Sequence, residues 1–538
     1  MTEPPNRRPN DGGDRGEPRN TFWDRFQPAE GPWDRRVLFS AGKQGELFAY
    51  RPGEIVVANE NLDGAVSWLK VHQPERQPQV VAVSTAFTLV GGVNDPIGAS
   101  AALRLGGFVA RVNHVFFADA DVFPNPGGFP NPGDRWTIAT GCCEGVRCVH
   151  GTSPKRRAQR RTLARPAGEP PNNSYPPPLR SVVCEDSECV VVIIDTGVAG
   201  PGTSTLHTVT DTASAKNAGA AKVAATAKNG PARKQPVVLY RPSGDIDTED
   251  RDDDGFLDPF SGHGSFIAGV INRVAPNARI VCHRAMPSAG DVDDFHVALA
   301  IDQVMARLGR LDVKYLHEKC GVANCKCSCA FCKGKSATLD NFFVCSSGHP
   351  KTTADLAEWS DAPVIVNLSF SGYAEDNDPP VCTAAASKRA MRGDPAKPGA
   401  SYRYSEGRDV VIVASAGNNS DCRIVWPGGF DEVIAVAALD GSFPAWYTNY
   451  GKWVNACAQG SNVISNFYHA DGVAFRERNQ FNGWASWSGT SFAAPLVAAA
   501  LAQEVLSTGD SPRDAVDRII EQPELYRLQG LGVVVNSY

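Results

Sequence analysis

The chain has 538 residues, 21% of them charged, and a formal net charge of −6. This length exceeds that of one ordinary domain and predicts two or three folded units. The net negative charge gives no general electrostatic basis for binding nucleic acid or a membrane surface. The sequence has no run of about 18 apolar residues, so we expect no transmembrane helix. We therefore expect neither nucleic acid nor membrane as a partner.

The N-terminal segment, residues 1–35, is polar and rich in Arg, Pro, Asp and Gly. It lacks the apolar core of a secretory signal. We expect a disordered tail and a cytoplasmic protein, with a secreted protein as the alternative. The 15 cysteines are an odd number, so they cannot all pair within one chain.

Residues 36–120 predict a small α+β module. Segment 53–57 is typical of a strand, 62–72 of a short helix, and 108–117 alternates as strands do. This module precedes the larger part of the chain, residues 185–538.

Residues 121–184 are rich in Pro and Arg and predict a linker. Its most basic part is 154–161, and exposed basic linkers are easily cut by proteases. We hypothesise a maturation cleavage between about residues 140 and 185. A solvated linker that is never cut is the alternative.

Two motifs in residues 185–538 carry acid and base groups. An apolar, β-branched run ends in Asp195, which is typical of a buried parallel strand with the acid at its carboxyl end. Catalytic groups of open α/β sheets gather at that edge. His263 lies between Gly262 and Gly264 at the start of a helix of small residues, so its imidazole can approach another backbone closely.

A third motif, residues 489–495, places Ser491 at the start of an Ala-rich, apolar helix. A helix start offers unpaired N–H groups and a positive dipole end, which suit an oxyanion beside the serine. A simple helix cap is the alternative for a serine at this position. The order Asp, His, Ser along the chain is that of the subtilisin arrangement.

These motifs resemble those of the subtilisin-like (S8) serine peptidases over residues 185–538. The resemblance implies a subtilisin-like three-layer α/β sandwich with a mainly parallel sheet. It also implies a serine endopeptidase that needs no cofactor for its chemistry. In such an enzyme Ser491 attacks the peptide carbonyl and His263 transfers the proton, while Asp195 orients the imidazole.

The resemblance extends to an oxyanion donor and a substrate strand. It makes Asn418, at the end of an apolar strand, the oxyanion donor. The partner it implies is an extended polypeptide, whose backbone pairs with Leu368, Ser369, Phe370, Ser371 and Gly372. The module at 36–120 resembles a subtilase prodomain, which folds the enzyme and blocks its cleft. An unrelated accessory domain is the alternative.

An acidic loop precedes His263 and has the D-x-D-x-D-G spacing of a calcium-binding loop. Its candidate ligands are Asp250, Asp252, Asp254 and Asp258. Ser261 stands where a full EF-hand loop has glutamate, so the affinity should be weak. A subsite for basic substrate residues and a solvated loop are the alternatives.

A cysteine-rich insert at 310–360 follows a predicted helix at about 292–308. Its candidate zinc ligands are Cys320, Cys325, Cys329, Cys332 and Cys345. Zinc is favoured in a reducing compartment and disulfides in an oxidising one. The insert is also a candidate surface for a protein partner. By resemblance to the mycosin-like branch, Cys382 and Cys422 are candidates for a disulfide.

Two other functions use the same motifs. In one, Asp195, His263 and Ser491 are not catalytic, and the chain is a regulatory or scaffold protein. In the other, a transpeptidase or cyclase passes the acyl-enzyme to an amine instead of water.

Overall fold

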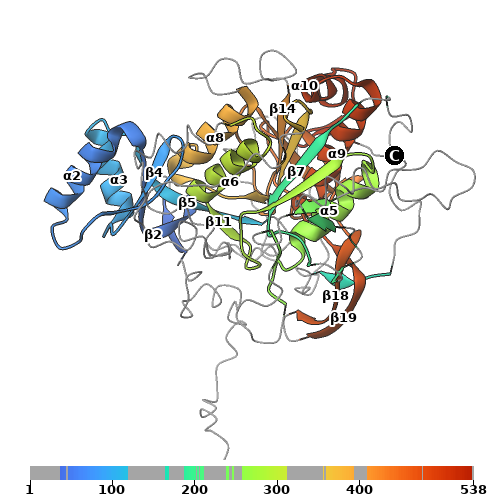
Figure 1. The fold of residues 1–538 in the computed structure, drawn as a ribbon, viewed down its shortest axis with the longest axis horizontal. Helices are drawn as coiled ribbons and strands as arrows, with labels where there is room; N and C mark the ends of the chain where they lie inside the picture. Colours follow the sequence, from blue (N-terminus) through green and yellow to red (C-terminus); the bar gives the residue numbers. More distant parts are fainter. Residues whose placement is uncertain are drawn as a thin grey trace, which may run out of the picture.

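A computed structural model gives the fold of the chain (Figure 1). It describes residues 37–43, 46–118, 164–168, 184, 187–200, 203–204, 206, 208–210, 238–240, 245–247, 257–311, 356, 359–392, 409–474 and 477–535.

The core is a sheet of mainly parallel strands. The strands are β7 Val190–Asp195, β8 Thr208–Thr210, β9 Val238–Tyr240, β10 Arg279–Arg284, β12 Val364–Leu368, β14 Val410–Ser415, β15 Val433–Asp440, β16 Phe443–Pro444, β17 Ala456–Gln459, β20 Arg527–Leu528 and β21 Gly532–Val534. Their order is β20-β21-β17-β15-β14-β12-β7-β10-β9-β8, with β16 paired to β15. β7, β12 and β14 are buried along their whole length, as their continuous apolar sequences require.

Helices cover both faces of this sheet (Figure 1). They are α5 His263–Val274, α6 Asp294–Arg307, α8 Val381–Arg392, α9 Thr490–Thr508, α10 Pro512–Val516 and the π-helical turn η6 Asp517–Glu521. α5 packs against α9, and α6 packs against α8, while each pair also contacts the strands. The predicted three-layer α/β sandwich is confirmed.

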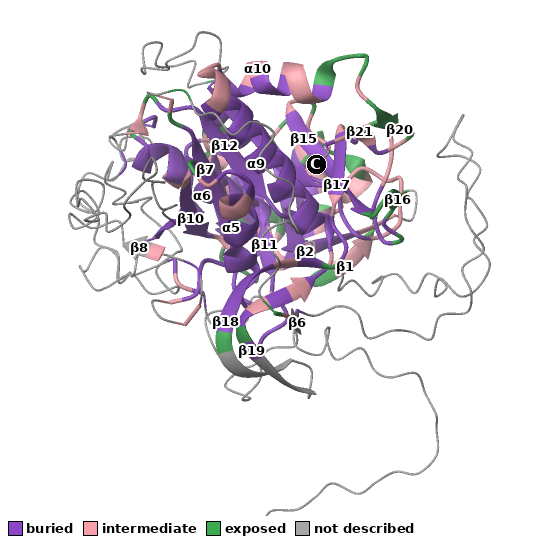
Figure 2. Cartoon of the chain, turned by 90° about the vertical axis from the view of Figure 1, so that its right-hand side faces the viewer, coloured by how far each residue is buried: buried purple, intermediate pink, exposed green. Residues whose placement is uncertain are grey.

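α9 is the central helix of the molecule and is buried from Thr490 to Leu506 (Figure 2). Its length and its mean hydropathy of 1.2 would also suit a membrane span, but 94% of that apolar window is buried inside the protein. A helix that is apolar on all sides is typical of a protein core. We therefore describe α9 as a core helix.

The N-terminal module is a small α+β unit, as predicted. Its elements are β1 Leu38–Ala41, β2 Leu47–Ala58, the 3-10 turn η1 Asn59–Asn61, α2 Leu62–His72, β3 Gln79–Val83, β4 Phe87–Gly91, α3 Pro96–Leu105 and β5 Ala110–Ala118. α2 and α3 pack on the sheet through a small apolar core that includes Ile55, Val57, Leu69 and Leu103. The other face of the sheet joins the main core through Val56, Leu89 and Phe116.

One sheet runs from this module into the larger unit. β5 pairs with a short strand of the larger unit, β11 Asp291–Asp293, on one side. On the other side it pairs with β2 and, further along, with a second short strand of the larger unit, β13 Phe370–Ser371. The resulting sheet has seven strands. The last strand of the module therefore lies between two segments of the larger unit.

A separate three-stranded sheet consists of β18 Val463–Ala474, β19 Glu477–Trp487 and β6 Arg165–Pro166. β18 contacts α5, and β19 ends three residues before α9 begins. This sheet was not predicted from the sequence.

Candidate active site

Asp195 and His263 meet where β7 ends and α5 begins. The distance from His263 Nδ1 to Asp195 Oδ1 is 2.8 Å, and both side chains are buried. Asp195 Oδ1 also accepts a hydrogen bond of 2.7 Å from the backbone N–H of Thr196. Because a carboxylate only accepts, Nδ1 carries the proton and Nε2 is the basic nitrogen of the neutral ring.

Two glycines allow this close approach. Gly262 precedes α5 with φ +78°, in the left-handed region. A Cβ on Gly264 would overlap the carbonyl oxygen of Gly197, just beyond Asp195. The start of α5 therefore packs directly on the backbone that follows β7.

Aromatic rings surround the imidazole of His263. Its ring centroid lies 5.4 Å from Trp487, 5.4 Å from Phe492 and 5.7 Å from Phe260. In the described part of the chain, His263 Nε2 is buried and has no hydrogen-bond partner. The basic nitrogen thus belongs to a ring surrounded by aromatic side chains, and it can accept a proton from a hydroxyl that turns toward it.

Ser491 is the second residue of α9 and is fully buried. Its Oγ donates to the backbone carbonyl of Ser369 at 2.9 Å, and Ser369 Oγ donates to the carbonyl of Ser491 at 2.9 Å. The second bond has a local cause. Pro495 has no N–H to donate to the Ser491 carbonyl four residues earlier, so that carbonyl is available to Ser369. Ser491 directly precedes Phe492, whose ring contacts His263, but Ser491 and His263 are not hydrogen-bonded to each other.

Asn418 lies just beyond β14 and has a fixed amide. Its Oδ1 accepts from the N–H and the hydroxyl of Thr490, at 3.0 and 2.8 Å. Its Nδ2 is buried and has no hydrogen-bond partner within the described ranges. The two bonds on the oxygen leave the amide nitrogen as a donor beside the start of α9.

β5 occupies the strand site predicted for a substrate. Phe117 pairs with Ser371, Ala118 pairs with Phe370, and the N–H of Ala118 donates to the carbonyl of Gly290 at 2.8 Å. A Cβ on Gly372 would come within 2.6 Å of the carbonyl oxygen of Val115, so the two chains are in direct contact. Within the segment 368–372, Phe370 and Ser371 therefore pair with a strand of the N-terminal module, and its pairing with a substrate stays a prediction.

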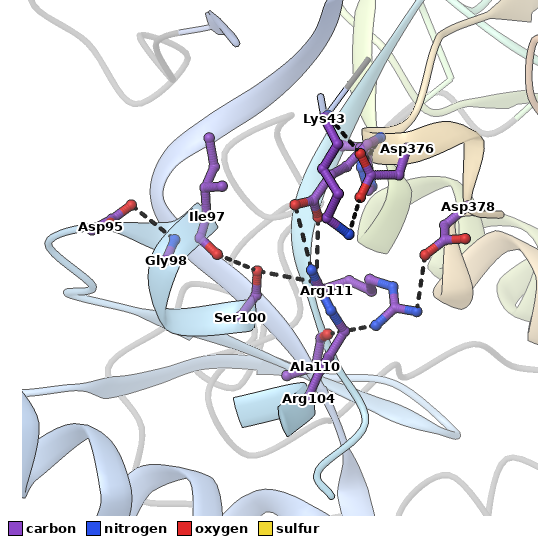
Figure 3. A network of polar contacts seen from close by, with 12 residues as sticks. Lys43, Asp95, Ile97, Gly98, Ser100, Arg104, Ala110, Arg111, Asp376 and Asp378 are labelled. Atoms are coloured by element: carbon purple, nitrogen blue, oxygen red, sulfur yellow. Dashed lines mark hydrogen bonds and ion pairs between the residues drawn. The ribbon is translucent and has the colours of Figure 1, made fainter. Parts of the chain in front are cut away.

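Ion pairs hold the module against the turn η4 Glu375–Asn377 (Figure 3). Lys43 Nζ lies 2.8 Å from Asp376, Arg104 lies 3.3 Å from Glu375 and Arg111 lies 3.4 Å from Asp378. The three cations belong to the module and the three carboxylates to the larger unit. The charges of the two surfaces are therefore complementary.

A buried histidine completes this contact. His114 Nε2 accepts a hydrogen bond of 3.0 Å from the backbone N–H of Glu375. Burial lowers the pKa of His114 to about 3, with help from the nearby guanidinium groups of Arg111 and Arg104. The neutral ring is the form that can accept this bond.

Asp247 supports the Asp195–His263 pair and was not predicted from the sequence. Its Oδ2 accepts from Thr196 Oγ1 at 3.1 Å and from the N–H of Gly262 at 2.7 Å, so it connects the residues beside both partners. Burial raises the pKa of Asp247 to about 7. No sequence signal marks it, because it lies in an irregular segment with neither periodicity nor a motif.

The candidate metal ligands are only partly described. Asp250, Asp252 and Asp254 lie outside the described residues, whereas Asp258 is buried and accepts a hydrogen bond from the Ser288 hydroxyl. The candidate zinc ligands Cys320, Cys325, Cys329, Cys332 and Cys345 also lie outside them. Within the described ranges, no group of three His, Cys, Asp or Glu side chains could hold a metal ion. Calcium and zinc both stay predictions.

The disulfide suggested between Cys382 and Cys422 is not formed in the described chain. Cys382 is buried at the start of α8, where its N–H donates to Asp294. The carbonyl of Cys422 instead accepts from the indole N–H of Trp453. The two residues are thus tied to different parts of the structure.

Comparison with known proteins agrees with this geometry. A family model described as "Subtilase family" matches residues 186–514, which is more than half of the chain. The chain belongs to the subtilase family. The match includes the segments that carry Asp195, His263, Asn418 and Ser491.

Similar proteins share shorter segments with this subtilase. The thermophilic serine proteinase of Bacillus sp. (strain AK1) is 35% identical over 96 residues, which are 18% of this chain and 21% of that protein. The halolysin of Haloferax mediterranei is 35% identical over 105 residues, which are 19% of this chain and 18% of that protein. A solved cold adapted subtilisin-like serine proteinase is 16% identical, with a TM-score of 0.36 over 65% of this chain and 89% of that one. The chain thus spans about a fifth of the length of the two curated relatives.

Proposed function

We propose that this subtilase is a serine endopeptidase that hydrolyses extended polypeptides through an acyl-enzyme. The observation that carries the proposal is the buried Asp195–His263 pair, whose Nε2 has no partner in the described chain and whose ring contacts Phe492 in the first turn of α9. Ser491 is the hydroxyl nucleophile at that helix start. An acid, a base and a hydroxyl in this arrangement support acyl transfer.

The reaction begins with a change in the hydrogen bond of Ser491. Its Oγ leaves the carbonyl of Ser369 and turns to His263 Nε2, which takes its proton as the oxygen attacks the substrate carbonyl. The imidazolium is stabilised by Asp195 and then gives the proton to the leaving amine. Water repeats the two steps on the acyl-enzyme and releases the acid product.

The negative charge that develops on the substrate oxygen meets two donors. One is Nδ2 of Asn418, whose orientation is fixed by the two bonds from Thr490. The other is the backbone N–H of Ser491 in the first turn of α9, where helical N–H groups lack intrahelical partners. Donors that are oriented before the reaction lower the barrier because they need no reorganisation.

The substrate binds as an extended strand in the place of β5. A peptide there pairs with β11 on one side and β13 on the other, as β5 does. The residue that follows the position of Ala118 then lies opposite Ser369, whose carbonyl is 2.9 Å from Ser491 Oγ. That residue supplies the carbonyl that is attacked, so Phe117 and Ala118 mark the third and second positions before the scissile bond.

The N-terminal module acts as an inhibitory prodomain, and its own chain is the first substrate. The register supports a first cleavage after Asp119, in contrast to the expectation of a cut between about residues 140 and 185. Mass spectrometry of the full-length chain beside the Ser491→Ala variant tests this. A wild-type chain that stays uncut at residue 119 under conditions where it cleaves added peptides would contradict it.

The proposed chemistry is tested with a fluorophosphonate probe on the full-length protein. Labelling of the wild type that vanishes in Ser491→Ala and falls strongly in His263→Ala is the expected result. Hydrolysis of an added peptide should follow the same order. Labelling that persists in Ser491→Ala, or a wild type that neither labels nor cleaves, would contradict the proposal.

A further inference from the structure

Two carboxylates lie on the strand that flanks the cleft. Asp291 and Asp293, the first and last residues of β11, are 7% and 1% exposed. Arg51 bridges them, with Nη2 2.6 Å from Asp291 Oδ2 and Nε 3.3 Å from Asp293 Oδ2. Arg51 itself is 4% exposed, so the contact is shielded from water.

The cation and the carboxylates belong to different parts of the molecule. Arg51 is on β2 of the N-terminal module, while β11 belongs to the larger unit, and β5 lies between them. Asp293 also accepts from the backbone N–H and the Nδ1 of His296, at 3.2 and 2.6 Å. When the module leaves, Arg51 leaves with it, and the two carboxylates stay on the wall of the cleft.

The strand register sets which substrate side chains would meet these carboxylates. Phe117 pairs directly with Asp291, and Val115 pairs directly with Asp293, in antiparallel register. Directly opposed residues of such strands project to the same face, with Cβ atoms about 4.5–5.5 Å apart. The same face carries Arg51, because its neighbour two residues back, Ala49, packs with Val115 and Phe117.

We infer that Asp291 and Asp293 form an acidic subsite that selects Lys or Arg at the third and fifth substrate positions before the scissile bond. These are the positions that Phe117 and Val115 occupy in the module. The inference rests on the proposed peptidase function.

The physical basis is charge complementarity: departure of the module removes Arg51 from two carboxylates that stay on the wall of the cleft. In the intact chain the module presents apolar side chains at both positions, and Arg51 supplies the positive charge from the neighbouring strand. A substrate has no second strand of this kind. Its own side chains must therefore supply the charge, and complementary charge favours the basic ones.

The test uses pairs of fluorogenic peptides that differ only in having Lys or Gln at the third and fifth positions. We expect the full-length wild-type protein to cleave the Lys peptide with a kcat/KM about tenfold higher, equivalent to one partly shielded ion pair. Each ratio compares two peptides on one preparation, so the fraction of chains with an open cleft cancels. The ratio should fall as salt is raised.

Matched variants assign the preference to the two carboxylates. The double variant Asp291→Asn, Asp293→Asn should bring the ratio close to one, and Asn keeps the helix-capping ability of residue 293. The variant Asp291→Lys should invert the preference toward Glu at the third position. Asp440→Asn, an exposed carboxylate at the end of β15, should leave the ratio unchanged.

Binding of the same labelled peptides to the Ser491→Ala chain, followed by fluorescence anisotropy, separates this inference from the proposed function. Equal cleavage of both peptides by the wild type, or a preference that survives in the double variant, would overturn the subsite and leave the peptidase intact. Tighter binding of the Lys peptide without any cleavage would support the subsite and overturn the peptidase. A chain that neither cleaves nor discriminates in binding would overturn both.

Discussion

The candidate catalytic centre and the contact with the N-terminal module are built in different ways. Asp195, His263 and Ser491 are fully or almost fully buried between the sheet and α9, and short hydrogen bonds and aromatic rings hold them. The module is held by strand pairing and by charges of opposite sign. The centre therefore depends on packing, which salt hardly affects, whereas the module can be loosened by screening or by loss of single charges.

The largest effect is expected inside the catalytic centre. Asn418→Ala removes the amide donor and should lower kcat/KM on a peptide substrate by about 10²–10³. Thr490→Val leaves that donor in place but removes one of the two bonds that orient it, so a loss of about tenfold is expected. Equal losses in the two variants would show that Asn418 acts by holding Thr490 and not as a donor.

The packing of the centre is tested by Gly264→Ala. The new Cβ would overlap the carbonyl oxygen of Gly197, so α5 must move away from β7. We expect the free energy of unfolding to fall by about 3 kcal/mol in a denaturant titration. The control is Gly441→Ala, at an exposed turn with φ +61° and no atom within 4 Å, which should cost about 1 kcal/mol. Similar losses at both sites would contradict the close approach.

The pH dependence of stability tests Asp247. Burial raises its folded-state pKa from 3.8 to about 7, so the folded protein holds this proton more tightly than the unfolded chain. Its stabilising contribution is complete below the unfolded pKa and is lost as the pH rises through the folded pKa. Relative to Asp247→Asn, the wild type should lose about 2 kcal/mol between about pH 5 and about pH 8. Parallel pH profiles for the two proteins would show that Asp247 is ionised throughout.

The contact with the module is tested first at its buried ion pairs. Arg51→Gln leaves Asp291 and Asp293 without their cation, which weakens docking of the module. Initial peptidase activity of the full-length chain should rise about tenfold. Arg513→Gln, whose partners Asp517 and Glu521 lie in the C-terminal region, is the control and should change little. An unchanged activity in Arg51→Gln would mean that strand pairing alone keeps the cleft closed.

The smallest effect is expected at the more exposed ion pairs. Arg111→Gln removes the pair with Asp378, a residue whose side chain is 55% exposed, and should raise activity no more than about twofold. The difference from wild type should disappear between about 0.05 M and about 1 M salt, because screening weakens in the wild type the pair that the variant lacks. A larger rise in activity in Arg111→Gln than in Arg51→Gln would show that the exposed ion pair contributes more to docking of the module than the buried ones.

The features predicted from the sequence are those that local pattern determines. The buried strands β7 and β14 were recognisable because a parallel strand covered on both faces has a continuous apolar sequence. The helix at 62–72 matched its predicted bounds. The segments that carry Asp195 and Asn418 were recognisable because each residue follows an apolar strand. Those that carry His263 and Ser491 were recognisable because each residue begins a helix of small or apolar residues.

The features that were missed depend on pairing between distant segments. β11 is three residues long, too short for any periodicity, and it is a strand because it pairs with β5. The edge strand at 368–372 was expected from the family resemblance, but its pairing with β5 was not. No local sequence pattern indicated the ion pairs of Arg51 either, because its partners lie about 240 residues away along the chain. The basic linker suggested a maturation cut from local composition alone, whereas the strand register points to residue 119.

Because the module and the larger unit share one sheet, cleavage of the chain after β5 and release of the module are separate events. Cutting the chain after β5 leaves in place the strand pairs and ion pairs that hold the module in the described part of the chain, because the module's own residues in these contacts lie upstream of the cut. Activity would therefore appear with a delay set by dissociation or digestion of the severed module, not by the first turnover. Dilution lowers the fraction of severed module that stays bound at equilibrium, so the activity finally reached depends on the protein concentration.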